Sequence, residues 1–429
     1  AIRFTLEMKA EGHARPGLPG SAGGGSESKP LALRVETRLV AVDRVVRSDA
    51  QGRPSRALRR VLQAASAING DVRPTAATLR PEVSLLVEEL SDAGSRVFSL
   101  GGPLTRQELE LVEVPADPLV LGWLLPEGQV AVGSHWKVPE SAARALTSYE
   151  TVAANSLLAT LEGLDDAKAR IKLSGEVRGA VLGAQGTITC SGVLTFDRAA
   201  GLIERLELTR TERRQAGEVE AGLDLKSTLT LERAKAPAPM PAELADSVVQ
   251  GLPAEFPAER DELLFTAPSG KYALRHDRSW HIYADDTRQT VLKRLERGAS
   301  IAQCNLALGP VAGKGRHQDL EQFRDDIKRA LGARFGRIVE AGALEGADDG
   351  VFRYRVAVEG HEGEVGLVWY YYLVASADGE QLLAAFTLGQ ARAREFADQD
   401  VRLIGTLEWK TAARPAEAPG QAPGSGPTD

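Results

Sequence analysis

The chain of 429 residues is poor in the side chains from which most metal and redox sites are built. It contains 2 cysteines, 2 methionines, 6 histidines and only 5% aromatic residues. Two cysteines are too few for a disulfide framework. The histidines are scattered through the chain: His13, His135, His276, His281, His317 and His361. His276 and His281 could approach one another across a turn, but zinc needs more ligands than that neighbourhood offers, so we expect no metal site.

Long apolar runs and a concentrated basic region are also missing. The longest apolar run, Leu367 to Ala375, has the length of a strand, whereas a membrane-spanning helix needs about 20 residues. The sequence therefore predicts no transmembrane segment. Lys and Arg number 52 and Asp and Glu number 59, which gives a well-mixed net charge of -7. This balance argues against nucleic acid as a partner and against a protein that binds a membrane surface through a polybasic region.

Sequence motifs for catalysis or nucleotide binding are incomplete. The loop Gly309–Gly315 follows a strand and precedes a helix, as a phosphate loop does. It has three residues between Gly309 and Gly313 instead of four, and Gly315 replaces the Ser or Thr that would bind magnesium. The acidic pairs at Asp285-Asp286, Asp325-Asp326 and Asp348-Asp349 are typical of turns and of a solvated helix face. We therefore expect no catalytic residues, no cofactor and no enzymatic activity.

Low-complexity stretches divide the chain into domains. Gly12 to Pro30 is rich in Gly and Ser, Ala236 to Pro241 reads APAPMP, and few large apolar side chains follow Lys410. Such segments cannot bury enough apolar surface to offset the entropy of ordering. We predict a β-rich domain at 1–233, a Pro/Ala-rich linker at 234–260, a second domain at 261–410 and a disordered tail at 411–429.

Apolar and polar residues alternate through much of the first domain. Ile2, Phe4, Leu6 and Met8 show the period of two that is typical of a half-buried strand. Similar long runs recur later: 169–177, 185–196, 203–211 and 223–231. Successive long antiparallel strands predict a strongly curved, half-barrel-like sheet.

Helical signals interrupt these strands in the middle of the domain. Thr105 and Glu108 form a capping box, and Asp117 followed by Pro118 is a second helix start. We expect the inserted helices to plug the concave face of the sheet. An alternative is a carrier that holds an apolar ligand or lipid on this face, with a lid made by Leu121, Trp123 and Leu124.

The second domain combines strand patterns with one clear amphipathic helix. The pattern predicts strands at Leu263–Thr266 and Tyr272–His276, then Trp280, further strands, and a helix from Asp319 to Leu331. This element order resembles the PsbP-like family (PsbP/DcrB type). The resemblance implies an α/β/α sandwich around an antiparallel sheet and docking through an exposed face. The expected fold class of the whole chain is therefore α+β.

The first domain resembles a group of uncharacterised exported bacterial proteins. The resemblance rests on the segment GGPLTRQEL at 101–109, on LLP at 124–126 and on Val132-Gly133 before Trp136. The start at Ala1 also fits a chain trimmed at a small-residue signal-peptidase site. We therefore expect an extracytoplasmic location, in the periplasm or the cell envelope.

Aromatic residues supply the candidate contact surface. The run Trp369-Tyr370-Tyr371-Tyr372 places two rings on each face of a strand, and Tyr and Trp are favoured at docking surfaces. Packing on both faces is the alternative interpretation. Our hypothesis is a non-enzymatic binding or scaffold protein of the cell envelope with a protein partner. Its predicted contact residues are Trp280, Trp369, Tyr370, Tyr371 and Tyr372.

Overall fold

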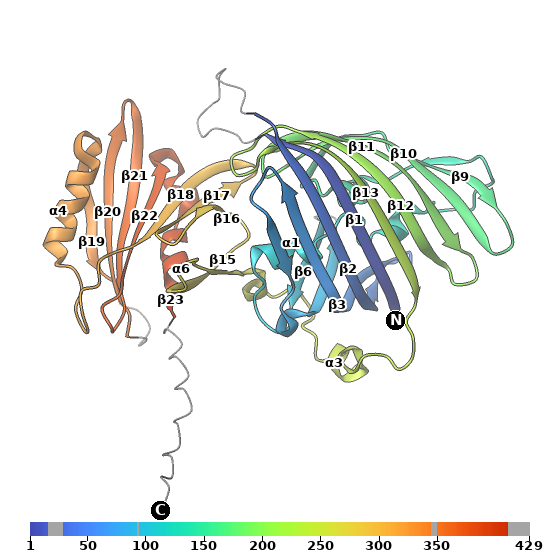
Figure 1. Cartoon of the computed structure of the whole chain (residues 1–429), viewed down its shortest axis with the longest axis horizontal. Coiled ribbons are helices and arrows are strands. Elements are labelled where there is room, and N and C mark those ends of the chain that lie inside the picture. Colours follow the sequence, from blue (N-terminus) through green and yellow to red (C-terminus); the bar gives the residue numbers. More distant parts are fainter. Residues whose placement is uncertain (16–28, 92–93, 345–349, 411–429) are drawn as a thin grey trace, which may run out of the picture.

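The computed structural model describes residues 1–15, 29–91, 94–344 and 350–410 (Figure 1). It is mostly β, with 54% of the described residues in strands and 16% in helices. The strands form three antiparallel sheets with 13, 7 and 3 strands. The predicted tail 411–429, most of the Gly/Ser-rich stretch and the Asp348-Asp349 pair lie outside the described residues.

The largest sheet forms the N-terminal unit, residues 1–235. Its strands follow the order β6-β5-β3-β2-β1-β13-β12-β11-β10-β9-β7, with β4 paired to β3 and β8 paired to β10. Their bounds are β1 Ile2–Arg15, β2 Leu31–Ser48, β3 Pro54–Gly70, β4 Thr75–Thr78, β5 Leu85–Ser91, β6 Gly94–Ser99, β7 His135–Lys137, β8 Thr151–Asn155, β9 Leu158–Leu164, β10 Lys168–Val181, β11 Ala184–Asp197, β12 Leu202–Arg214 and β13 Gly222–Lys235.

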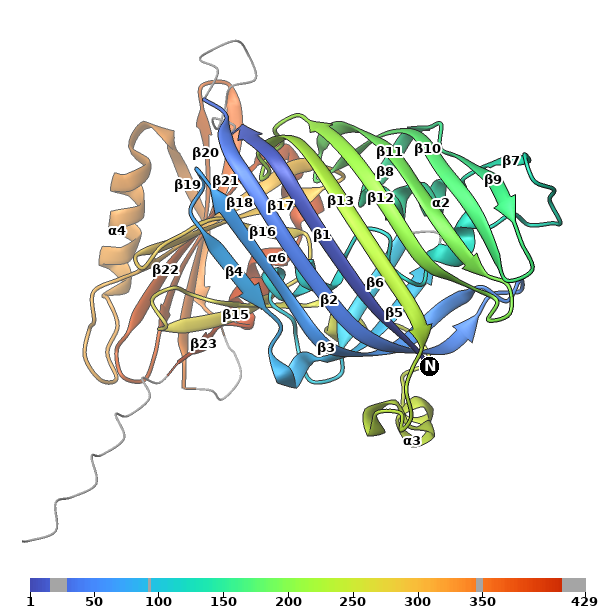
Figure 2. The ribbon, with the colours of Figure 1, turned by 45° about the vertical axis from the view of Figure 1, so that its right-hand side comes forward.

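Period-two alternation gives the sheet one apolar and one charged face. In β1, Phe4 and Leu6 are buried on the concave side, while Arg3 and Glu7 are exposed on the other. Exposed ion pairs such as Arg38 with Glu7 join neighbouring strands across the charged face. Figure 2 shows the long strands side by side, with α2, β5 and β6 behind them. The predicted strands and their antiparallel order are confirmed here.

Short helices fill the concave side of this sheet. They are α1 Arg106–Val112, η2 Leu121–Leu124 and α2 Glu140–Thr147, with η1 Pro81–Val83 before β5. The predicted capping box of Thr105 and Glu108 is present at the start of α1. The helix predicted after Asp117 is only a 3₁₀ turn, η2. The Asp117 carboxylate still accepts a 2.9 Å hydrogen bond from the Leu119 N–H, and it also belongs to a buried charge cluster.

This cluster centres on Arg59 of β3, whose side chain is fully buried. Its guanidinium lies 2.7 Å from carboxylate oxygens of Asp43, Glu88 and Asp117. The three acids come from β2, β5 and the loop before η2, so a single cation ties the sheet to the helices on its concave face. Removing one partner from such a cluster leaves an uncompensated buried charge.

The C-terminal unit, residues 263–409, is built on the 7-stranded sheet β16-β17-β18-β22-β21-β20-β19. Its strands are β16 Trp280–Asp285, β17 Gln289–Glu296, β18 Ala299–Leu308, β19 Phe335–Ala343, β20 Phe352–Glu362, β21 Val365–Ala375 and β22 Gln381–Gly389. The predicted amphipathic helix is α4 Leu320–Leu331, capped by Asp319, and it packs Phe323 and Ile327 against one face of the sheet.

The other face of this sheet is covered by a second sheet together with short helices. The strands β14 Leu263–Thr266, β15 Tyr272–His276 and β23 Glu408–Trp409 form the 3-stranded sheet, and the short helices α5 Ala393–Phe396 and α6 Gln399–Gly405 share its core. The short helix η6 Gln390–Arg392 precedes α5, whereas η5 Gly332–Arg334 instead follows α4. The expected α+β class with an α/β/α sandwich is therefore wrong. The pattern located β14 and β15, but only the pairing of β15 with β23 shows that they form a separate β layer.

The segment predicted as a linker packs on the N-terminal unit. We call residues 236–262 the strap; it contains η3 Ala242–Leu244, α3 Asp246–Gln250 and η4 Ala258–Asp261. Its apolar side chains, Leu244 and Phe256 among them, cover Leu58 and Phe98 on the outer face of the sheet. Arg44 donates a 2.7 Å hydrogen bond to the Leu244 carbonyl. In this region the sheet is therefore buried on both faces.

Replacing the central cation tests the importance of the charge cluster. The Arg59→Met variant should lower the free energy of unfolding by about 3–5 kcal/mol, because it leaves three buried carboxyl groups without their cation. Arg38→Met, which removes an exposed ion pair, is the control and should cost less than about 1 kcal/mol. Urea denaturation measures both. Equal, small losses would show that the cluster contributes little.

Candidate functional site

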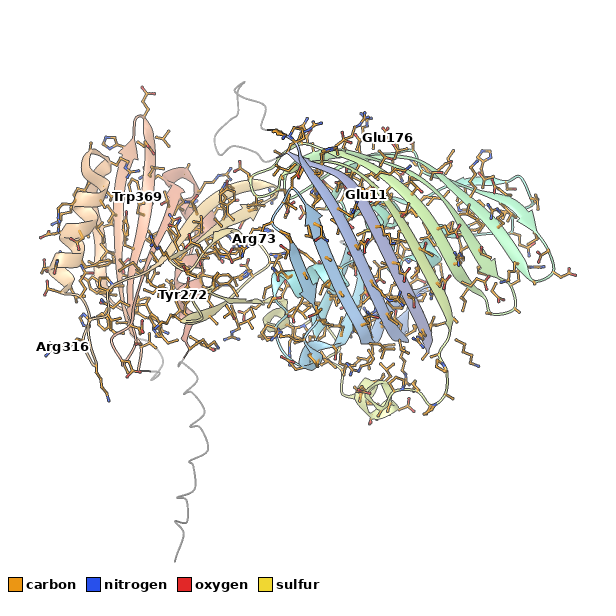
Figure 3. All side chains as sticks on the ribbon, in the orientation of Figure 1. Glu11, Arg73, Glu176, Tyr272, Arg316 and Trp369 are labelled. Carbon is orange, nitrogen blue, oxygen red and sulfur yellow. The ribbon has the colours of Figure 1, made fainter. Side chains whose placement is uncertain are left out.

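The predicted docking residues lie mainly inside the C-terminal unit. Trp280 is 1% exposed, Trp369 3% and Tyr372 0%. Trp369 packs in the cluster beneath α4 (Figure 3), and Trp280 packs edge-on against Phe386 at 6.0 Å between ring centroids. Side chains this deeply buried offer a partner almost no surface, so any contact through them stays a prediction.

The two remaining tyrosines of the run are partly buried. Tyr370 stacks on Phe396 and lies under the Arg355 guanidinium, which is 4.3 Å from its ring centroid. Tyr371 packs against the cluster beneath α4. Tyr372 donates a 2.7 Å hydrogen bond to the buried carboxylate of Asp400. The run therefore bridges the two cores of the C-terminal unit.

The residues predicted as a lid belong to the core of the N-terminal unit. Leu121 and Leu124 are buried, and both contact the same apolar cluster as the sheet residues Phe4 and Leu6. Trp123 is partly buried, with the Arg53 guanidinium 5.0 Å from its ring centroid. These three side chains fill the concave face where they lie.

A cleft of about 400 Å³ lies between the two units. The N-terminal unit supplies Glu113 at the end of α1 and Glu150 before β8, together with Ser95, Arg106, Leu109 and Leu182. The C-terminal unit supplies the opposite wall, formed by Arg278, Ser279, His281, Leu295, Arg297 and Gly298. Residues far apart in the sequence therefore meet around one hollow.

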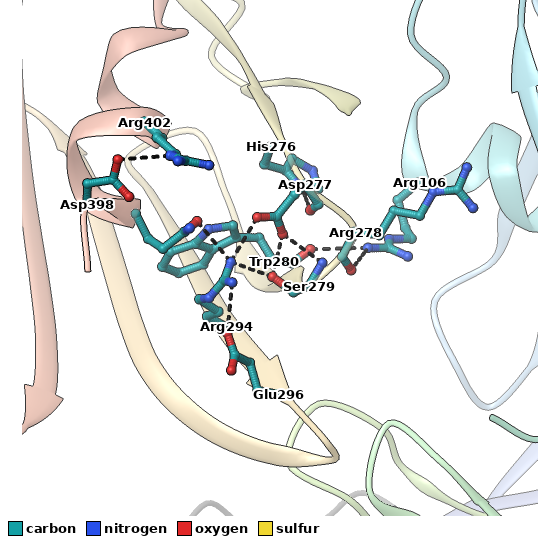
Figure 4. Close-up of polar contacts among 11 residues, drawn as sticks. Arg106, His276, Asp277, Arg278, Ser279, Trp280, Arg294, Glu296, Asp398 and Arg402 are labelled. Carbon is teal, nitrogen blue, oxygen red and sulfur yellow. Dashed lines mark hydrogen bonds and ion pairs between the residues drawn. The ribbon is translucent and has the colours of Figure 1, made fainter. Parts of the chain in front are cut away.

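Arginines hold the two walls together. Arg106 reaches across the cleft and donates hydrogen bonds to the carbonyls of Arg278, at 2.8 Å, and Trp280, at 3.2 Å (Figure 4). In the opposite direction, Arg278 forms ion pairs of 2.7 Å with Glu113 and with Asp261 of the strap. These contacts fix the shape of the cleft without an apolar interface at this point.

The cleft continues into a smaller pocket inside the N-terminal unit. This inner pocket has a volume of about 260 Å³ and shares Ser95, Glu113 and Glu150 with the cleft. Glu88 and Asp117 of the buried charge cluster form part of its wall, so the charge cluster borders the hollow directly. Ser95 donates a 2.9 Å hydrogen bond to Glu88.

Several ionisable groups around the cleft have shifted pKa values. Burial raises the pKa of the Glu88 carboxyl well above its ordinary value, and desolvation in the cleft also raises the pKa of Glu113. Burial lowers the pKa of His276 to about 4, and burial with the nearby Arg106 charge lowers the pKa of His281 to about 4. Both imidazoles are therefore neutral at pH 7.

The hydroxyl of Ser279 on the cleft wall is held by a carboxylate. Ser279 donates a hydrogen bond to Asp277, and Asp277 is also paired with Arg294 at 2.9 Å (Figure 4). Among the described residues, no group of three or more potential metal ligands is present. The described residues also contain no helix with the length and hydropathy that crossing a bilayer requires.

Sequence reasoning found few of these residues. Of the cleft residues, it singled out His281 alone, in a pair with His276, and both side chains are buried beside the cleft. Glu113 and Arg278 are 165 positions apart, and nothing in their local patterns marks them as partners. Glu88 and Arg59 are charged residues inside strands, and charge at core-facing positions was the one signal that could have identified them.

The buried histidines make stability depend on pH. In the folded chain their pKa is about 4, against about 6.5 when unfolded, so the unfolded chain binds more protons between these values. The free energy of unfolding should therefore fall as pH drops from 6.5 to 4, by at most about 3 kcal/mol per histidine.

Denaturation of matched variants at several pH values tests this expectation. His276→Asn combined with His281→Asn should flatten the dependence between pH 6.5 and 4. His135→Asn, at an exposed position of the N-terminal unit, should leave it unchanged. An equally steep dependence in the double variant would assign the effect to other groups.

Comparisons with known proteins show no family for this chain. No family model matches it, and no curated protein matches it. Among solved structures, a protein of Bacteroides thetaiotaomicron is 12% identical, with 34% of this chain covering 48% of that one at a TM-score of 0.25. Lipovitellin is 10% identical; the match covers 56% of this chain and 26% of lipovitellin, with a TM-score of 0.30. The chain thus spans half or less of these first neighbours, and similarity at such scores carries no conclusion about function.

Proposed function

We propose that the protein is a non-enzymatic binding protein that holds a small ligand in the cleft between its two units. The supporting observation is the cleft with its inner pocket, about 400 and 260 Å³, lined by charged side chains from both units. Pockets at domain interfaces with a few converging polar groups are the usual location of small-molecule sites.

The geometry of the walls favours binding over catalysis. The charged groups are already engaged in fixed contacts: Glu113 with Arg278, and Glu150 with the backbone N–H of Leu182 at 3.0 Å. Groups held in this way are positioned before a ligand arrives, which lowers the cost of binding.

A lipid or apolar ligand on the concave sheet is a weaker proposal. Leu121 and Leu124, the residues of the predicted lid, are packed in the core. The cell-envelope location and a protein partner, which the sequence resemblances imply, stay predictions.

Filling the inner pocket tests the proposed function. Ala145 of α2 is partly buried and lines this pocket, so Ala145→Trp should fill the space. We expect compounds from a metabolite library to raise the melting temperature of the native protein by several degrees at saturation. The same compounds should produce no shift in Ala145→Trp.

A substitution at an exposed position outside the cleft provides the control. Glu127→Trp, in the loop after η2, should keep the native response. Circular dichroism spectra that match the native protein establish that both variants fold. Stabilising compounds that act equally on Ala145→Trp would place the binding site elsewhere and refute the proposal.

A further inference from the structure

Charges are segregated along the hollow. The inner pocket is lined by four carboxyl groups and one guanidinium: Glu88, Glu113, Asp117, Glu150 and Arg144. The outer cleft carries three guanidinium groups: Arg106, Arg278 and Arg297. Glu113 and Glu150 stand where the two parts meet. A ligand that extends through both parts therefore passes from a cationic region into an anionic one.

The carboxyl groups of the inner pocket are built into the core of the N-terminal unit. Glu88 is 3% exposed and Asp117 4% exposed, so neither belongs to a solvated surface. Arg59 contacts both of them and Asp43, and the Arg233 guanidinium is near enough to interact with Asp43 and Asp117, which places two positive charges near three acids. The Glu88 Oε2 atom is ion-paired with Arg59 at 2.7 Å, and Ser95 donates a 2.9 Å hydrogen bond to its Oε1 atom. An ammonium group in the pocket would add a charge-assisted contact to the carboxyl groups that line it.

The remaining walls of the inner pocket are apolar. Leu90, Val114, Val120 and Ala145 line it beside the carboxyl groups. Its volume of about 260 Å³ is below the roughly 300–1,000 Å³ of pockets for drug-sized ligands. Such a space suits an ammonium group on a short carbon chain.

The outer guanidinium groups differ in how much positive charge they leave uncompensated. Arg278 is paired with Glu113 and Asp261. Arg106 is held instead by neutral carbonyl groups. Arg297 is exposed in the turn between β17 and β18, and no ion pair engages it in the described part of the chain. Arg106 and Arg297 are therefore the groups that can face an anion.

We infer that the ligand is a zwitterion whose ammonium group enters the inner pocket against Glu88 and Glu150, while its anionic group faces Arg106 and Arg297. This inference rests on the proposed function and specifies its ligand. A short peptide with free ends and an aminoalkyl phosphate share this chemistry. The two differ in the anion, which guanidinium groups bind as carboxylate or as phosphate.

Calorimetric titration of the full chain with matched probes tests the inference. The probes are glycyl-leucine, its N-acetyl form, its C-terminal amide and phosphoethanolamine. Glycyl-leucine or phosphoethanolamine should bind, and the stronger of the two identifies the anion. N-acetylation removes the ammonium group and should weaken binding of the peptide at least tenfold. Amidation removes the carboxylate and should also weaken it.

Variants of the two walls locate each end of the ligand. Glu88→Gln should weaken binding of the zwitterionic probe at least tenfold. Glu150→Gln, at an exposed position, tests the same end if Glu88→Gln does not fold. Arg297→Gln should weaken binding of glycyl-leucine but not binding of its C-terminal amide, which lacks the anionic group. Glu127→Gln, at an exposed position outside the cleft, is the control and should bind as the native protein does.

Two results separate this inference from the proposed function. The zwitterion is refuted if the compounds that lose their effect in Ala145→Trp all lack an ammonium group. It is also refuted if the N-acetyl peptide binds as tightly as the free peptide. In both cases the cleft remains the binding site. If no compound distinguishes Ala145→Trp from the native protein, the proposed function itself fails.

Discussion

One guanidinium surrounded by three carboxyl groups determines much of this structure. Arg59 joins β2, β5 and the loop before η2, so the helices on the concave face are held to the sheet by charge as well as by apolar contact. Burying charge is costly unless geometry is good, and the 2.7 Å contacts meet that condition. The same cluster borders the inner pocket. The N-terminal unit therefore carries its imbalance of charge at the place where a ligand can reach it.

The cleft depends on both units. The N-terminal unit supplies the carboxyl groups of the inner pocket, and the C-terminal unit supplies Arg278 and Arg297. Contacts across the cleft are polar and directional, with Arg106 and Arg278 each reaching to the opposite wall, and beside them Leu263 of β14 is buried in the N-terminal core. Inter-domain contacts of this kind resemble transient interfaces more than cores, which permits small changes in the cleft when a ligand binds.

Local patterns in the sequence predicted individual elements well. The alternation from Ile2 to Met8, the capping box of α1 and the apolar stripe of α4 all appear as expected, because each depends on neighbours within a few positions. The layer arrangement could not be read in this way: β15, the partner of β14, also pairs with the two-residue strand β23, more than a hundred positions later. The site was missed for the same reason, since Glu113, Arg278 and Arg297 gain their roles only from long-range folding.

The strap connects the two units and also completes the packing of the N-terminal unit. Residues 236–262 connect the units, yet their apolar side chains complete the N-terminal unit by covering the outer face of β2, β3, β5 and β6. A chain cut after the last long strand, near Lys235, would expose Val42, Leu58 and Phe98 to water. Such a fragment would be prone to self-association. The N-terminal unit therefore needs the strap to cover its apolar outer face.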